Sequence, residues 1–223
     1  MTRLLLPFLL ILTANAAFAG AWLREKGAGF SATTASITLA RDFSEETFLE
    51  YGVRDDLTLG LELGFLHFAN GLQAGSASLF LRRPIGTKEA EAKLAYELGL
   101  GVGWRGELVE PLIKAGLSWG RGYSLGRISG WASVDASITW TVYTNEPLVK
   151  LDSTLGMNFT DRISGMVQAF HARSLGVAAT SIAPSVIIQP MRNQKNLRIR
   201  IGAETQVGNS MNTALKLGLW REF

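Results

Sequence analysis

Apolar and polar residues alternate along most of the chain with a period of two. The clearest case is residues 57–65, where four leucines and a phenylalanine take the odd positions and Thr, Gly, Glu and Gly take the even positions. A period of two is that of a β-strand whose two faces meet different surroundings. The same alternation returns in residues 94–102 and 133–140. The pattern therefore predicts strands.

Twelve segments of this kind follow one another from Gly29 to the end of the chain, separated by short polar breaks. No linker or shift in composition divides them, so we expect one domain over residues 20–223. Pro184 falls inside the tenth segment, where its missing N–H predicts a bulge or a shifted boundary. The predicted segments are centred near residues 35, 50, 62, 79, 97, 115, 135, 152, 167, 184, 200 and 217.

The start of the chain has the features of a secretory signal peptide. Residues 1–19 contain one early cation, Arg3, then an apolar stretch, then the small residues Ala17 and Ala19. The apolar stretch is shorter than the roughly 20 residues that a membrane-spanning helix needs. We therefore expect residues 1–19 to be removed, which leaves Gly20 as the first residue.

The last strand ends on an aromatic carboxy terminus. Its apolar residues share one face, and this ending resembles the terminal assembly signal of Gram-negative outer-membrane β-barrels. The resemblance implies that the barrel-assembly machinery binds this strand. Arg221 departs from the pattern, because such signals usually carry an apolar or aromatic residue at that position. The residues of the proposed assembly signal are Leu215, Leu217, Leu219 and Phe223.

Composition agrees with a membrane barrel. The chain is 47% hydrophobic with 24 glycines, yet no apolar run after residue 19 approaches the length of a spanning helix. In a bilayer, such a chain satisfies its backbone only as a closed sheet. A soluble sandwich would also alternate, but the repetition and both chain ends favour the membrane. We predict an all-β fold, a transmembrane antiparallel up-and-down barrel of about twelve strands in the bacterial outer membrane.

Charge and cysteine content exclude several classes of function. Without Arg3, 21 Lys and Arg face 19 Asp and Glu, which is not the balance of a nucleic-acid-binding protein. There is no cysteine, so neither disulfides nor thiolate metal sites are available. We expect no cofactor, no metal and a monomer surrounded by outer-membrane lipid.

If the leucine-bearing face meets lipid, the opposite face lines the lumen. Its charged residues nearly balance, seven cations against six anions. The predicted lumen-lining cations are Arg82, Lys93, Lys114, Lys150, Arg198, Arg200 and Lys216, and the anions are Glu50, Glu62, Glu97, Asp135, Asp152 and Glu204.

Two interpretations of these charges stay open. They neutralise one another in a filled interior, with Lys114 beside Asp135 and Asp135 beside Lys150 on adjacent strands. Alternatively they line a narrow aqueous path. In that case Arg198, Arg200 and Lys216 form a cationic wall opposite Glu50 and Glu62, and the field between them orders dipolar or zwitterionic solutes.

Five tryptophans are candidates for an aromatic girdle, because indole rings prefer the membrane–water interface. Ordinary core aromatics are the alternative. The strand map places Trp104 and Trp140 near the outer rim and Trp119, Trp131 and Trp220 near the periplasmic rim.

Some twelve-stranded outer-membrane proteins are lipid-modifying enzymes, so His67 and His171 are candidate bases. They fall on the third and ninth strands, on opposite walls of the ring, and we expect them not to share a site. The outer breaks are short, which argues against a constriction loop or a large receptor surface.

Four stretches resemble small Gram-negative outer-membrane proteins grouped with transporters. The resemblance implies a barrel and transport, and carries over no catalytic residue. We predict a narrow passive channel or transporter for small solutes. The alternatives are a structural envelope barrel sealed by salt bridges and a lipid-modifying enzyme. The stretches are Ala21-Trp-Leu-Arg-Glu-Lys-Gly-Ala-Gly-Phe30, Tyr51-Gly-Val with Leu57-Thr-Leu-Gly60, Leu117-Ser-Trp-Gly-Arg-Gly122 and Leu215-Lys-Leu-Gly-Leu-Trp-Arg-Glu-Phe223.

Overall fold

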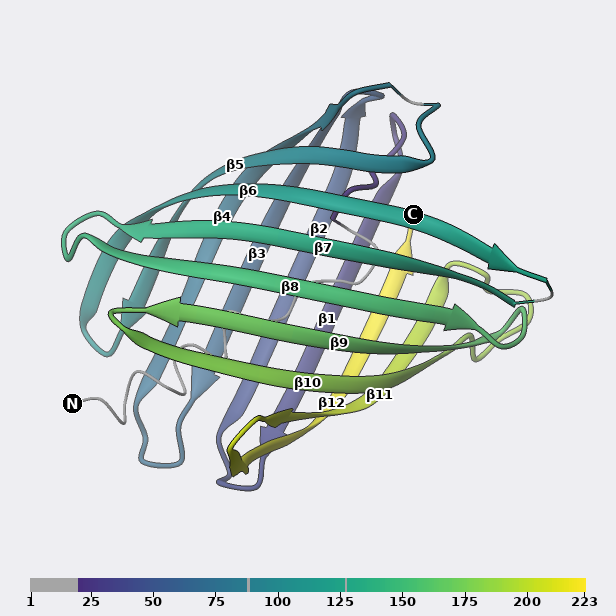
Figure 1. The fold of residues 1–223 in the computed structure, drawn as a ribbon. Helices are drawn as coiled ribbons and strands as arrows, with labels where there is room; N and C mark the ends of the chain where they lie inside the picture. Colours follow the sequence, from purple (N-terminus) through teal and green to yellow (C-terminus); the bar gives the residue numbers. More distant parts are fainter. Residues whose placement is uncertain (1–19, 88, 127) are drawn as a thin grey trace.

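A computed structural model describes residues 20–87, 89–126 and 128–223, so the predicted signal peptide lies outside the described residues. Twelve strands form a closed barrel, and β12 pairs with β1 to complete the ring (Figure 1). Every strand is antiparallel to its neighbours in sequence. The strands are β1 (Gly29–Thr38), β2 (Phe43–Arg54), β3 (Leu57–His67), β4 (Gln73–Ile85), β5 (Ala92–Arg105), β6 (Leu108–Leu125), β7 (Ile128–Thr141), β8 (Glu146–Asn158), β9 (Ile163–Ser174), β10 (Val177–Ile188), β11 (Leu197–Gln206) and β12 (Asn209–Glu222).

The predicted strand count and order are confirmed, and each predicted centre lies inside its strand. Connections that follow even-numbered strands lie at the end of the barrel where β1 starts and β12 ends, which we call the terminal end. The turns between β2 and β3 and between β8 and β9 both lie there. We call the opposite end the far end. No helix in the described parts of the chain is long and apolar enough to cross a membrane.

The two faces of the wall differ as the alternation predicts. Leu79 and its cross-strand partner Leu100 point outward and keep 67% and 68% of their surface exposed, whereas Phe80, the residue after Leu79, points inward and keeps 3%. In water, an outer surface of this kind would be unfavourable over such an area. In a bilayer it replaces lipid–lipid contacts at little cost, so the outer face is a lipid-facing surface.

Turns at the far end are tight, as predicted from the short breaks. The loop between β9 and β10 has only two residues, and both Leu175 and Gly176 adopt positive φ angles, of 50° and 77°. Two successive positive φ values define the type I′ turn, whose twist matches that of the two flanking strands. Glycine adopts this conformation without strain, whereas the leucine does so at a cost. No long loop covers the far mouth within the described residues.

Pro184 interrupts the sheet without shifting it. The β10–β11 ladder pairs Ile182 with Thr205 and Ser185 with Gly202, and the two rungs between them are missing. The register is the same on both sides of the gap, so the predicted bulge or shifted boundary is wrong here. Pro184 has no N–H to donate toward β11, whereas its pairing with Val167 of β9 is retained.

The tryptophans divide between the two faces, and the girdle prediction is wrong for two of them. Trp131 and Trp220 point inward and keep only 5% and 2% of their surface exposed. Trp104, Trp119 and Trp140 lie on the outward face of their strands, and Trp104 packs against outward-facing Phe65 at 5.4 Å. A girdle role for these three stays a prediction.

An apolar layer fills the inside of the barrel toward the terminal end. Small inward residues make room for its rings: Gly60 lies against Phe80, and Gly156 lies against Trp131, so closely that neither glycine could carry a Cβ. Phe48 stacks on Phe80 at 5.5 Å. The members of this apolar layer are Phe30, Ala32, Phe48, Phe80, Trp131, Met166, Ile187 and Trp220, with Trp22 packed against them.

Asp56, in the turn between β2 and β3, gives the barrel a pH-dependent contact outside the membrane span. Arg54 donates two hydrogen bonds of 3.0 Å to its carboxylate, and Arg83 of β4 donates one of 2.5 Å. Chiefly the hydrogen bonds from Arg54 lower the pKa of Asp56 from 3.8 to about 2. Because the folded-state pKa is the lower one, the stabilisation is complete above about pH 4 and is lost as the pH falls through about 2.

We therefore expect Asp56→Asn to lower the urea midpoint of unfolding at pH 7 by a small amount, since exposed ion pairs contribute little. At pH 2 most of this difference should have disappeared, because about half of the Asp56 carboxylates in the original protein are then protonated. Asp161→Asn, in the corresponding turn between β8 and β9, is the matched control and should change neither midpoint. A difference for Asp56→Asn that persists unchanged at pH 2 would contradict this account.

Candidate functional site: the barrel lumen

The alternation places all thirteen predicted lumen residues on the inward face of their strands. Glu50, Arg82 and Arg200 are buried, with 1%, 4% and 2% of their surface exposed. Lys93 and Arg198 lie nearer the terminal end and are half-buried. These charges have left bulk water, so their partners decide whether the interior is stable.

Five residues on β2 to β6 form one connected ion-pair network, which we call the Arg82 network: Glu50, Glu62, Arg82, Glu97 and Lys114. The Arg82 guanidinium bonds Glu50 and lies 2.6 Å from Oε2 of Glu97. Lys114 Nζ lies 2.8 Å from Oε1 of Glu97 and 2.7 Å from Oε1 of Glu62. Each buried charge therefore has an opposite charge within hydrogen-bond distance, which is what burial demands.

Two cations of the Arg82 network lie over the face of the Phe80 ring. The Arg82 guanidinium carbon is 5.0 Å, and Lys114 Nζ is 5.7 Å, from the centre of the Phe80 ring. A cation over the face of a desolvated ring is stabilised by the ring's quadrupole. Phe80 thus contacts both the other rings of the apolar layer and the cations of the Arg82 network.

The opposite wall, on β9 to β12, has its own polar group. Lys216 Nζ lies 2.6 Å from Oε2 of Glu204, and Ser181 donates to Oε1 of Glu204 at 2.5 Å. Arg200 donates to Oε1 of Gln168 at 2.6 Å and to Oγ of Ser185 at 3.0 Å. Both cations are thus held by partners on the same wall.

Two predicted charge arrangements are wrong. Lys114 stands opposite Thr139 rather than Asp135, and Lys150 stands opposite Ser137. Asp135 faces a second anion, Asp152, across the β7–β8 ladder. Lys150 reaches Asp152 on its own strand at 3.8 Å. The reason is the stagger between neighbouring strands of a barrel, which displaces residues that equal spacing along the chain would place side by side.

The predicted cationic wall opposite Glu50 and Glu62 is also wrong. Arg200 and Lys216 bond to groups on their own side, and both glutamates bond to cations on the first half of the ring. Arg198 lines a separate polar recess at the terminal end, beside Ser164 and Gln189. Ion pairs within one wall are favoured over unpaired charges on facing walls, because an unpaired buried charge has a large desolvation cost.

Three cavities lined by described residues lie one after another inside the barrel. The cavity nearest the far end has a volume of about 50 Å³ and is lined by Asp42, Glu46 and Asn212 among others. The middle cavity has about 80 Å³ and shares Glu46 with it. The deepest has about 30 Å³ and shares Glu62 and Lys114 with the middle one. At roughly 15 Å³ per water, together they hold on the order of ten water molecules.

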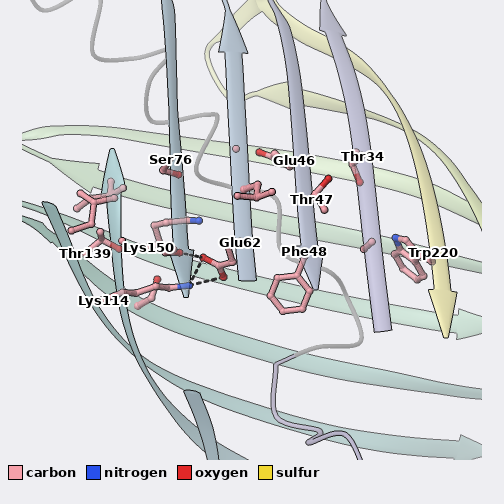
Figure 2. Close-up of a pocket in the computed structure, with 18 of the residues that line it drawn as sticks. Thr34, Glu46, Thr47, Phe48, Glu62, Ser76, Lys114, Thr139, Lys150 and Trp220 are labelled. Carbon is pink, nitrogen blue, oxygen red and sulfur yellow. Dashed lines mark hydrogen bonds and ion pairs between the residues drawn. The ribbon is translucent and has the colours of Figure 1, made fainter. Parts of the chain in front are cut away.

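The middle cavity combines charge with aromatic surface. Figure 2 shows Lys114 and Lys150 on one side of it, near Glu62, with Phe48 and Trp220 on the other. Glu46, which the sequence reasoning missed, also lines it. Glu46 lies four residues before Glu50 on β2 and therefore shares its inward face, so the alternation could have placed it in the lumen.

The sequence reasoning also gave no place to residues 20–28, which we call the N-terminal segment. In the structure it enters the barrel. Gly52 of β2 makes two backbone hydrogen bonds with it: the Gly27 N–H donates to Gly52 O at 2.8 Å, and the Gly52 N–H donates to Ala28 O at 2.9 Å. The Arg24 backbone N–H donates to Thr58 Oγ1 at 3.0 Å, and its side chain lies 2.8 Å from Glu50. Arg24 thereby joins the Arg82 network.

The two histidines lie apart, as expected from their strands. His67 on β3 and His171 on β9 are six strands apart in the ring, and both side chains point outward and are exposed. His171 Nδ1 is 2.9 Å from Thr180 Oγ1. Among the described residues, no group of three His, Asp or Glu is placed to hold a metal ion.

Solved structures with this architecture include outer-membrane porins and channels and the β-domain of a Bordetella autotransporter. No family model and no curated protein matches the chain. The KdgM porin superposes with a TM-score of 0.61 at 7% identity, over 87% of this chain and 99% of that one. The NanC porin gives 0.59 at 8% identity, over 85% and 98%. An outer-membrane channel from Pseudomonas putida F1 gives 0.55 at 14% identity, over 94% and 100%.

These likenesses establish the fold and confirm the sequence prediction of its class. The chain is a twelve-stranded transmembrane β-barrel of the outer-membrane type, with a polar and charged interior. The resemblance to small outer-membrane barrels of the transporter type agrees with these neighbours. Identities of 7–14% carry no residue's role from those proteins to this one.

Proposed function

We propose that this protein is a narrow passive channel of the bacterial outer membrane for small dipolar or zwitterionic solutes. The observation that carries the proposal is the row of three cavities, walled by charged residues, inside a barrel whose outer face is apolar. A solute with both charges finds Lys150 and Lys114 beside Glu62 and Glu46 in the middle cavity. Phe48 and Trp220 offer it an apolar face there.

The structural neighbours support a conduit. Several of them are porins and channels, and the KdgM porin was also solved in complex with disordered oligogalacturonate. That ligand is a polyanion. Here the cations of the lumen are matched by carboxylates, so the interior favours a solute of low net charge over a polyanion. We further propose that the protein resides in the outer membrane and that residues 1–19 are removed. The barrel-assembly machinery recognises its last strand.

Charge selectivity tests the role of the middle cavity. Lys150 is the chosen residue because its ammonium lies 3.8 Å from its nearest paired carboxylate, less tightly held than Lys114 or Lys216. We expect Lys150→Glu to shift the reversal potential under a salt gradient toward cations. About 1 kcal/mol, the Coulomb energy of two unit charges about 4 Å apart in water, changes a permeability ratio about fivefold.

Planar lipid bilayers provide the measurement. The control is Arg173→Glu on β9, which reverses an exposed charge on the outward face of the wall and should leave selectivity unchanged. Equal reversal potentials for Lys150→Glu and the unsubstituted protein would remove the middle cavity from the conduction path.

A second candidate function is a structural envelope barrel with a sealed interior. The observation that favours it is the apolar layer together with the Arg82 network, which occupies much of the cross-section near the terminal end. A barrel of this kind gives no unitary current under any condition. The absence of current from both the complete protein and a variant without the N-terminal segment would therefore favour it.

A further inference from the structure

The N-terminal segment crosses the inside of the barrel from one wall to the opposite one. It leaves β1, passes β2 and β3 through the contacts of Gly27 and Arg24, and reaches β6 and β7. In the closed ring β7 is six strands from β1 in either direction, which is the maximum separation. The segment therefore spans the width of the terminal mouth.

Close packing holds the far part of the segment in place. Ala21 keeps 2% of its surface exposed. The Trp22 ring lies over Gly120 of β6, where an added Cβ would come within 2.5 Å of it. Trp22 also packs against the apolar layer. Burial of Ala21 and of part of the Trp22 ring removes apolar surface from water and so stabilises the seated position.

Gly20 ends the described segment against the Asp135 carboxylate of β7. A Cβ at position 20 would overlap the carboxylate, so a larger residue there would require the Asp135 side chain to move. Asp135 stands across the ladder from Asp152, and two anions in directly opposite positions repel each other. A positive charge placed at Gly20 would relieve this repulsion. Cleavage after Ala19 creates such a charge, the α-ammonium group of Gly20.

The row of cavities ends at the same place. The deepest cavity is lined by Gly20 as well as by Glu97, Lys114 and Asp135. The path from the far end therefore meets the N-terminal segment before it reaches the terminal mouth. Withdrawal of the segment would widen this cavity toward the terminal end, because Gly20 is part of its lining.

We propose that residues 20–28 are a resident plug of the channel, anchored by the free ammonium of Gly20 on the Asp135 carboxylate. The plug bars the terminal mouth, and conduction requires its withdrawal. The inference rests on the proposed channel function and on the predicted cleavage after Ala19. It adds a regulatory element, since the anchor exists only in the processed protein.

Deletion of residues 21–28 tests the plug, with Gly20 retained so that the cleavage site is unchanged. Folding is checked by heat-modifiable migration in gels and by a β-sheet circular dichroism spectrum. We expect a severalfold larger unitary conductance than in the complete protein. Equal, non-zero conductance in both proteins rejects the plug and leaves the channel. Silence of both rejects the channel function and the plug with it.

A disulfide lock provides a second test that leaves the segment in place. The chain has no cysteine, so Ala21→Cys with Gly120→Cys can form only one bridge. The Ala21 Cβ lies 3.1 Å from the Cβ position of residue 120, near the 3.5 Å lower bound typical of disulfides. Trp22→Ala is added to free the space that the ring occupies.

In the triple variant we expect the bridge to form and the conductance to be low until a reductant is added, when it rises severalfold. Trp22→Ala alone is the control and should not respond to reductant. Failure of the bridge to form in folded protein rejects the seated position. A formed bridge with unchanged conductance rejects the plug.

The anchor is tested by Asp135→Asn, which removes the anion and keeps the shape. We expect the fraction of time spent in the high-conductance state to rise severalfold. Ser133→Ala, two residues away on the same inward face of β7, is the control and should leave gating unchanged. Gating that is unchanged in Asp135→Asn rejects the ammonium anchor.

Discussion

Replacing Arg82 by methionine is expected to destabilise the barrel by about 3–5 kcal/mol, the cost of removing one partner from a buried ion pair. Arg82 is the only described cation that bonds both Glu50 and Glu97. The Glu50 side chain is fully buried, and after the substitution it keeps only Arg24 as a partner. Methionine fills a similar volume, so the loss reports charge rather than packing.

Urea unfolding in lipid or detergent, followed by tryptophan fluorescence, measures this loss. Arg83→Met is the matched control at the next position. Arg83 points outward, keeps 44% of its side chain exposed and pairs only with Asp56, so its replacement should cost at most about 1 kcal/mol. Adding Glu50→Gln to Arg82→Met should recover part of the loss, because it removes the stranded anion. Equal losses for Arg82→Met and Arg83→Met would contradict the account.

Alternation alone identified the members of the Arg82 network but not their partners. Arg82 and Glu97 face each other directly across β4 and β5. Glu50 and Arg82, however, bond across the intervening strand β3. They can do so because the inward residues between them, Thr58 and Gly60, are small. Period two gives the face of a residue, whereas its partners depend on register and stagger, which one sequence does not encode locally.

The tryptophan error has a similar origin. On the last strand Trp220 shares the parity of Lys216, and on β7 Trp131 shares that of Ser133. This parity places both rings on the inward face, whatever the preference of indole for interfaces. The structure shows that space decides: Gly156 leaves a gap that the Trp131 ring fills.

The N-terminal segment escaped sequence reasoning for a different reason. It has no periodicity, since its place is set by contacts with strands far along the chain, Gly120 on β6 and Asp135 on β7. Only the presence of Trp22 and Arg24 in so short a stretch hinted at a buried position. Propensity and pattern describe local structure, and a segment held by tertiary contacts alone lies outside their reach.

The lumen thus has two parts that differ in how densely they are packed. Toward the far end, cavities whose walls combine charged and apolar groups have room for water, and short turns leave the mouth uncovered. Toward the terminal end, aromatic rings and paired charges pack densely, and the N-terminal segment completes the packing. Residues at the boundary between these parts should therefore influence stability and conduction together, which makes Phe80 the most informative single position.

Phe80→Ala is expected to lower the free energy of unfolding by about 3–5 kcal/mol, the usual cost of deleting a buried phenylalanine. The substitution removes the ring that stacks on Phe48, contacts Gly60 and lies beneath the cations Arg82 and Lys114. Unitary conductance should rise as well, because the space vacated adjoins Phe48 and Lys114, which both line the middle and deepest cavities.

Leu79→Ala is the control that separates the effects of Phe80→Ala on stability and conductance from those of removing an apolar side chain elsewhere on the strand. Leu79 is the preceding residue on the same strand, points into the lipid and is 67% exposed. Its truncation should cost about 1 kcal/mol, because lipid chains fill the space at once, and should leave conductance unchanged. Urea unfolding and bilayer recordings on both variants decide the matter. If Phe80→Ala is destabilised no more than Leu79→Ala, the apolar layer does not support the barrel from within. If its conductance is unchanged, the layer does not narrow the path.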